Sequence, residues 1–259
     1  MKVVILAGGL GTRISEESYL KPKPMVEIGG KPILWHIMKI FEAQGFNDFI
    51  ICLGYKGYMI KDYFINYYLY NSDVTVDLAS NSLHIHRTNS ENFKVTLVDT
   101  GLHTQTAGRL KQVRRYLGEK DFLLTYGDGL ADVDLQKLVA FHKKQKKLTT
   151  VTAVQPAGRF GLVGIDQENI VTNFHEKPLG DGGWINGGFF VMSPGIFSYL
   201  PEYADTQMLE QDTLEGLARD RQLAAFKHHG FWKCMDALRD KQDLEAIWNS
   251  EQPAWKIWA

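Results

Sequence analysis

The chain has 259 residues, 44% of them hydrophobic, and its 29 basic and 30 acidic side chains leave a formal net charge of −1. This length allows one large domain with a sizeable core. The balanced charge gives no global field favouring nucleic acid or a membrane surface, and no stretch reaches the ~18 apolar residues of a membrane span. Any anion recognition must therefore be local.

Strand and helix patterns alternate along the first 155 residues. Strands are predicted over 3–7, 48–53, 122–126 and 148–154, and helices over 31–44, 58–70, 107–117 and 134–144. The alternation predicts an α/β fold, a Rossmann-like, mostly parallel central sheet with helices on both faces. The shorter segments over 74–100 have the pattern of an antiparallel excursion. Helices are also predicted over 205–221 and 240–249.

The 259 residues are interpreted as a single domain. Its core is expected over about 1–155, and a smaller α+β elaboration over about 156–259, where glycine content rises and the pattern becomes less regular. The apolar run at the N-terminus is too short for a signal peptide, and Cys52 and Cys234 lack disulfide or zinc spacing. A cytoplasmic protein is expected.

The first predicted strand ends in a glycine-rich loop, GGLGTR, followed by KPKPM. Ligands of parallel sheets bind beyond the carboxyl ends of the strands, and glycines there let backbone N–H groups approach a phosphate. Gly8, Gly9 and Gly11 therefore suit a phosphate or nucleotide cradle. Arg13 can bind phosphate oxygens with two hydrogen bonds, and Lys23 adds a point charge between two prolines. The alternative is a plain glycine turn with basic surface residues.

Two better-known phosphate loops are excluded by the spacing. A Walker loop needs a lysine after its last glycine, but Thr12 and Arg13 follow Gly11. A dinucleotide fingerprint needs a third glycine where this chain has Ile14.

A carboxylate follows the predicted strand 122–126 within the sequence TYGDG. Asp128 at that strand end is a candidate ligand for Mg²⁺, which prefers hard oxygen ligands and substrate phosphates. Asp-Gly also favours simple turns, so a second carboxylate is needed. Asp236 is a candidate, but nothing in the spacing pairs it with Asp128.

Three further motifs, GRFG, HEKP and INGGFF, place polar groups beside glycine or proline. Glu176 and Asn186 have the chemistry to bind sugar hydroxyls, and Lys177 to bind a phosphate. Exposed hairpin residues are the alternative interpretation of each motif.

The order ILAGGLGTR, KPKPM, GDG, EKP, NGG extends across nearly the whole chain, and in this the chain resembles the sugar-phosphate nucleotidylyltransferases. TAGRLKQV, GRFG, INGGFFV, FWKCMDALRDK and PAWKIW resemble the branch that makes CDP-glucose. The resemblance implies a nucleotide-diphospho-sugar transferase fold and the substrates CTP and glucose 1-phosphate. It also implies a homo-oligomer and a role in bacterial surface polysaccharide synthesis.

The resemblance also assigns residues. The nucleotide and its triphosphate would contact Leu6, Ala7, Gly8, Gly9, Gly11, Thr12, Arg13, Thr106 and Arg109. The sugar phosphate would contact Gly161, Glu176, Lys177, Asn186 and Gly187. Asp128 and Asp236 would bind Mg²⁺, and Arg13 and Lys23 would be catalytic.

The implied reaction is attack of the sugar phosphate on the α-phosphorus of CTP, with pyrophosphate leaving in line. The nucleophile is already an anion, so no general base is required, and positioning and electrostatics would provide the catalysis. The same reaction with dTTP, UTP, GTP or another sugar is an alternative. A non-catalytic nucleotide-binding regulatory subunit is another.

Overall fold

The computed structural model describes residues 1–88, 91–156, 162–165, 167–168, 170–175 and 183–258. Side chains are described for these residues except at 13, 15, 16, 87, 88, 162–165 and 173–175. Gly161, Glu176 and Lys177, three of the residues assigned to the sugar phosphate, thus lie outside the described residues.

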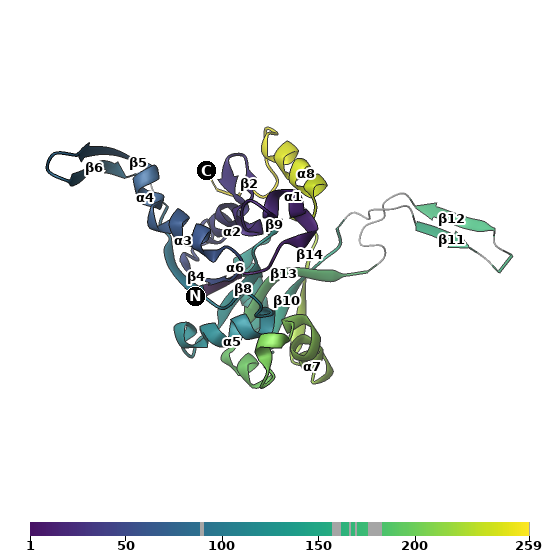
Figure 1. Cartoon of the computed structure of the whole chain (residues 1–259). Coiled ribbons are helices and arrows are strands. Elements are labelled where there is room, and N and C mark those ends of the chain that lie inside the picture. The colour runs from purple at the N-terminus through teal and green to yellow at the C-terminus, as the bar shows by residue number, and fades with distance from the viewer. Residues whose placement is uncertain (89–90, 157–161, 166, 169, 176–182, 259) are drawn as a thin grey trace.

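A seven-stranded sheet forms the centre of the molecule (Figure 1), in the order β14-β10-β13-β8-β1-β4-β7. Only β13 runs antiparallel to its neighbours, β10 and β8, and the other adjacent pairs are parallel. The predicted mostly parallel α/β sheet is confirmed. The strands are β1 (Lys2–Leu6), β4 (Asp48–Leu53), β7 (Lys94–Asp99), β8 (Phe122–Tyr126), β10 (Thr149–Val154), β13 (Ile185–Met192) and β14 (Leu223–His228).

Helices and short two-stranded ribbons surround this sheet. The α-helices are α1 (Ser15–Ser18), α2 (Ile33–Glu42), α3 (Gly57–Ile65), α4 (Tyr67–Tyr70), α5 (Thr106–Leu117), α6 (Leu135–Gln145), α7 (Leu214–Arg219) and α8 (Leu238–Trp248). The ribbons pair β2 (Glu27–Ile28) with β3 (Lys31–Pro32), β5 (Ser72–Asp77) with β6 (Ser82–Thr88), β9 (Gly129–Ala131) with β15 (Trp232–Cys234), and β11 (Leu162–Ile165) with β12 (Val171–His175). Short single-turn or irregular helices are η1 (Thr12–Ile14), η2 (Lys23–Met25), η4 (Pro194–Ser198), η5 (Ala204–Thr206) and the π-helix η6 (Leu209–Thr213).

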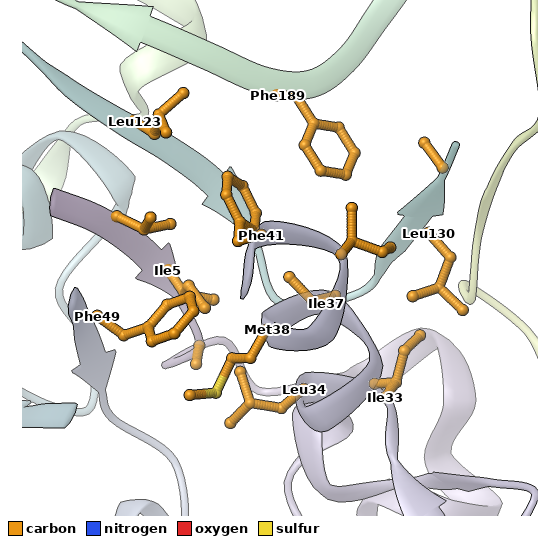
Figure 2. Packing of buried hydrophobic residues seen from close by; sticks show 14 of the residues in the cluster. Ile5, Ile33, Leu34, Ile37, Met38, Phe41, Phe49, Leu123, Leu130 and Phe189 are labelled. Carbon is orange, nitrogen blue, oxygen red and sulfur yellow. The ribbon is translucent and has the colours of Figure 1, made fainter. Parts of the chain in front are cut away.

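The sheet is buried on both faces, which explains the unbroken apolar runs of its strands. In β1, Val3 and Ile5 face one hydrophobic cluster, and Val4 and Leu6 face the other. Helix α2 covers the first face, and Figure 2 shows its side chains packed against those of β1, β4, β8 and β13. Its labelled members are Ile33, Leu34, Ile37, Met38 and Phe41, recurring at helical spacing. Burying each such side chain contributes about 1.5–3 kcal/mol.

Helices α5 and α7 cover the opposite face. Cys52 of β4 lies in this second cluster and is fully buried. Burial raises the pKa of its thiol to about 12, so the thiolate, the reactive form, is disfavoured.

The segment 74–100 is only partly the antiparallel excursion that was expected. β5 and β6 form an antiparallel hairpin that projects from the body (Figure 1), but β7 joins the central sheet parallel to β4. β7 is an edge strand with several half-exposed residues, so its sequence alternates like an antiparallel strand.

Two differences concern the second half of the chain. The predicted helix 205–221 is broken, because Gln207 and Met208 are extended between η5 and η6 and Gln211 leaves the helical angles inside η6 at ψ −112°. The segment after residue 156 also supplies β13 and β14 to the central sheet. Among the described helices, none combines the length and apolar character needed to span a bilayer.

Candidate active site

A pocket opens at the carboxyl ends of β1 and β8, beside the start of α5. It brings together the glycine loop, Lys23, Asp128 and the first turn of α5, which are far apart in the sequence. Its lining residues are Leu6, Ala7, Gly8, Gly9, Gly11, Lys23, Pro24, Thr104, Gln105, Thr106, Arg109, Tyr126, Gly127 and Asp128. This is the sheet edge at which parallel α/β proteins bind ligands.

The glycine loop is held from behind by a buried arginine. The Arg109 guanidinium donates to the carbonyls of Gly8 (3.0 Å) and Leu53 (2.9 Å) and to Thr100 Oγ1 (2.7 Å). A Cβ at Gly8 would lie 2.0 Å from Arg109 Nη1, so a larger residue there would displace the buried guanidinium. Burial lowers the pKa of Arg109, although an arginine remains charged. Arg109 both lines the pocket and shapes the loop.

The tip of the loop has a different requirement for glycine. Gly11 has a φ of +67°, in the left-handed region, and its carbonyl accepts from Ser18 Oγ at 2.9 Å. A Cβ at Gly9, by contrast, would meet nothing within 4 Å in the described structure. Gly9 is exposed, which leaves its backbone open to a ligand. The side chain of Arg13 lies outside the described part of the structure.

Lys23 joins the two carboxylates that the sequence could not pair. Its ammonium nitrogen lies 2.6 Å from Asp128 Oδ2 and 2.7 Å from Asp236 Oδ1. Burial alone would lower the pKa of Lys23, but the charges and hydrogen bonds of Asp128 and Asp236 outweigh burial, and the pKa is raised. Lys23 therefore stays protonated at neutral pH, and both carboxylates converge on one cation.

An antiparallel ribbon brings Asp236 to Asp128. β9 begins directly after Asp128, β15 ends two residues before Asp236, and Cys234 pairs with Gly129. The backbone N–H of Met235 donates to the Asp128 carbonyl at 2.9 Å. Asp240 at the start of α8 then accepts from the backbone N–H of Asp236 at 3.0 Å. The positions of both carboxylates thus follow from backbone pairing.

The paired carboxylates have the chemistry of a site for a hard divalent cation. Mg²⁺ is commonly held by one or two carboxylates together with substrate phosphates. Within the described residues, no group of three or more His, Cys, Asp or Glu side chains could hold a metal by itself. Asp128 and Asp236 therefore suit a metal that a substrate helps to bind.

The strand β13 carries the two described residues that were assigned to the sugar phosphate. Asn186 Nδ2 donates to the hydroxyl of Tyr126 at 3.1 Å, and the Gly187 carbonyl accepts from Trp232 Nε1 at 2.7 Å. Trp232 belongs to β15, so the ribbon that positions Asp236 also contacts β13. The structure places Asn186 beside the pocket through Tyr126, which lines it.

Comparison with known proteins shows the family of this chain. The family model described as nucleotidyl transferase matches residues 2–246. The chain belongs to the nucleotidyl transferase family.

Two curated relatives align with this nucleotidyl transferase over the full length of both chains. They are the glucose-1-phosphate cytidylyltransferase of Salmonella typhi, 54% identical over 259 residues, and the probable glucose-1-phosphate cytidylyltransferase of Bacillus subtilis (strain 168), 44% identical over 258 residues. Among solved structures, HddC from Yersinia pseudotuberculosis has a TM-score of 0.69 and 27% identity, covering 96% of this chain and 99% of that one.

The pocket of this nucleotidyl transferase also contains residues that the motifs did not indicate. Thr104, Gln105 and Tyr126 line it, and Glu210 binds two of its lining residues from behind. Tyr126 could have been noticed, because it ends a predicted strand just before GDG. Glu210 lies in the irregular helix η6 and has no local sequence signal.

Proposed function

We propose that this chain transfers the cytidylyl group of CTP to glucose 1-phosphate, giving CDP-glucose and pyrophosphate. The observation that carries the proposal is the convergence of Lys23, Asp128 and Asp236 beside the glycine loop. The full-length similarity to two cytidylyltransferases supports the choice of CTP and glucose. The alternatives are another nucleotide, such as dTTP, UTP or GTP, another sugar, or a nucleotide-binding subunit without activity.

In the proposed mechanism the chain positions two polyanions for in-line displacement. Backbone N–H groups of the glycine loop and Thr106 bind the nucleotide, and Arg13 stabilises the leaving pyrophosphate. Lys23 and Lys177 offset charge on the reacting phosphates. The sugar phosphate is bound by Gly161, Glu176, Asn186 and Gly187. An oxygen of glucose 1-phosphate forms the new bond to the α-phosphorus as the bond to pyrophosphate breaks.

The family generally uses a divalent metal ion, and we propose Mg²⁺ for this chain. Asp128 and Asp236 would hold it, because one oxygen of each carboxylate already lies within hydrogen-bonding distance of the Lys23 ammonium group. When bound, Mg²⁺ supplies charge neutralisation on the substrate phosphates. Both carboxylates are hard oxygen ligands, so the donor set fits this ion.

The test is pyrophosphate release with glucose 1-phosphate and Mg²⁺, with CTP, UTP, dTTP, GTP and ATP in separate reactions. Strong release with CTP alone is expected. Release with a different nucleotide would overturn the base assignment and keep the reaction class. No release with folded protein, also after other sugar 1-phosphates are tried, would favour the subunit without activity.

We further propose a cytoplasmic homo-oligomer built from this single-domain chain. The hairpin β5–β6 and the helices before it expose large apolar side chains, among them Tyr70, Val76 and Leu78. Such side chains on a projecting element suit contact with another copy of the chain. Light scattering would measure the oligomeric state, and a monomer at micromolar concentration would contradict the proposed homo-oligomer.

A further inference from the structure

A carboxylate lies directly behind the pocket wall. Glu210 of η6 accepts a hydrogen bond from Thr106 Oγ1 at 2.9 Å through one oxygen and a hydrogen bond from the Tyr126 hydroxyl through the other. Both partners line the pocket, whereas Glu210 is not among its lining residues. Glu210 is half-buried, and its hydrogen bonds to the pocket wall are made through these two hydroxyls.

The start of α5 fixes the position of this carboxylate. The backbone N–H of Leu209 donates to Thr106 Oγ1 at 2.7 Å, and the same hydroxyl donates to Glu210. Thr106 therefore binds two successive residues of η6. This double contact holds Glu210 in place although the backbone at Gln211 is not helical.

The carboxylate determines the direction of the hydrogen bonds beyond it. An ionised carboxylate can only accept, so Tyr126 donates its single proton to Glu210. The Tyr126 oxygen can then only accept from its other neighbour, Asn186.

The amide of Asn186 is held at both ends. Its Nδ2 donates to Tyr126 at 3.1 Å, and its Oδ1 accepts from the backbone N–H of Gly188 at 2.9 Å. Gly188 has a φ of +88°, and a Cβ there would lie 2.8 Å from the Tyr126 ring. The relay from Glu210 through Tyr126 to Asn186 thus connects the first turn of α5 with β13.

We propose that Glu210 is a positioning residue for sugar recognition. By accepting the Tyr126 hydrogen bond it keeps the Tyr126 oxygen as an acceptor for Asn186, and so holds the Asn186 side chain in one position for the sugar phosphate, which favours one configuration of sugar hydroxyls over its epimers. The inference rests on the proposed function, in which Asn186 contacts glucose 1-phosphate.

The test measures KM for both substrates in Glu210→Gln, Tyr126→Phe and the double variant, with Glu215→Gln as the control. Glu215 is an exposed acid on the next helix. In Glu210→Gln an amide N–H replaces one acceptor, so either Thr106 or Tyr126 loses its acceptor. Tyr126→Phe breaks the link to Asn186 and leaves the bond between Thr106 and Glu210 in place. In Tyr126→Phe we expect KM for glucose 1-phosphate to rise roughly tenfold, the scale of one well-placed hydrogen bond, and KM for CTP to change less than about twofold.

Two further readouts separate positioning from a general loss of structure. Discrimination between glucose 1-phosphate and galactose 1-phosphate should fall in Glu210→Gln and Tyr126→Phe. The double variant should be no worse than the poorer single variant, because residues acting through one another are not additive. If Glu210→Gln does not fold, Tyr126→Phe carries the same sugar-specific readouts.

If the wild-type enzyme is active and these variants keep its KM values and its sugar discrimination, the inference about Glu210 is wrong and the proposed function stands. Equal increases in both KM values in Tyr126→Phe, or additive effects in the double variant, would also overturn the inference. A wild-type enzyme without turnover would overturn the proposed function, and this inference with it.

Discussion

The ammonium group of Lys23 lies 2.6 Å from Oδ2 of Asp128, at the point where the Asp236 carboxylate also converges. A cation of the protein itself therefore holds together the two carboxylates proposed to bind Mg²⁺. A metal ion and Lys23 would compete for the same oxygens. Metal binding would then accompany movement of Lys23 toward a substrate phosphate.

Replacing Lys23 by methionine should therefore strengthen metal binding in the absence of nucleotide. We expect Mn²⁺ to bind Lys23→Met roughly tenfold more tightly than the wild type, because the two carboxylates lose a competing positive charge. Electron paramagnetic resonance of free Mn²⁺ measures this directly. Lys21→Met is the matched control, since Lys21 pairs with Glu27 and not with the two aspartates. Equal or weaker binding in Lys23→Met would show that no such competition exists.

Two neighbouring glycines should respond differently to the same substitution. Gly8→Ala places a Cβ 2.0 Å from the Arg109 guanidinium, so it should destabilise the fold by about 2–4 kcal/mol through displaced buried hydrogen bonds. Gly9→Ala meets nothing in the described structure and should leave stability within about 0.5 kcal/mol.

Urea unfolding measures both glycine variants. If the glycine loop is the proposed phosphate cradle, Gly9→Ala should also raise KM for CTP, because the new methyl group lies where the phosphates approach. If Gly8→Ala is as stable as the wild type, then Arg109 does not fix the loop as described.

The stability of the fold should depend on pH through His36, which contacts Trp255 of the C-terminal tail. Its Nε2–H donates to the Ile28 carbonyl at 2.7 Å, and Trp255 Nε1 approaches its Nδ1 at 3.4 Å, which fixes the neutral ring. Burial lowers the pKa of His36 to about 4, partly opposed by the hydrogen bond to Ile28.

Because the pKa of His36 is depressed in the folded state, the unfolded chain takes up this proton first as pH falls. The contribution of His36 to stability is complete above pH ~6.5 and is lost between there and pH ~4, with roughly 2 kcal/mol lost from pH 7 to pH 5. His36→Gln keeps a donor for Ile28 and should show a smaller decline over this range in urea unfolding. The exposed His84→Gln serves as control. Identical declines in wild type and His36→Gln would contradict this assignment.

Arg13 is predicted to act on the leaving pyrophosphate. Arg13→Ala should lower kcat by about 100-fold or more, the typical effect of removing one group that stabilises developing charge. Thermal unfolding should be nearly unchanged, and Arg115→Ala on the exposed side of α5 is the control. Near-normal turnover in Arg13→Ala would remove this residue from the mechanism.

Much of the fold could be predicted from the sequence because its elements are strongly periodic. α2 and β4 were found within two residues at each end, since both have continuous buried patterns. The parallel pairing of β7 was missed because an edge strand buries only part of its surface. The entry of β13 into the sheet depends on a long-range connection that no local pattern contains.

The site could be predicted only in pieces. Gly8, Lys23 and Asp128 stood out because their residue types and strand-end positions suit phosphate and metal. The pairing of Asp128 with Asp236 requires the ribbon β9–β15, which joins residues about a hundred positions apart in sequence. Glu210 lies in an irregular helix and reaches the pocket through contacts with Thr106 and Tyr126, which are distant in the sequence, so no local pattern indicates it.

The central claim is that the phosphate of glucose 1-phosphate attacks the α-phosphorus of CTP. The most direct measurement follows ³²P-labelled glucose 1-phosphate in a reaction with unlabelled CTP and Mg²⁺. We expect the label to appear in CDP-glucose while the released pyrophosphate is unlabelled. Release of pyrophosphate with the label still in glucose 1-phosphate would mean simple hydrolysis of CTP, and would contradict the claim.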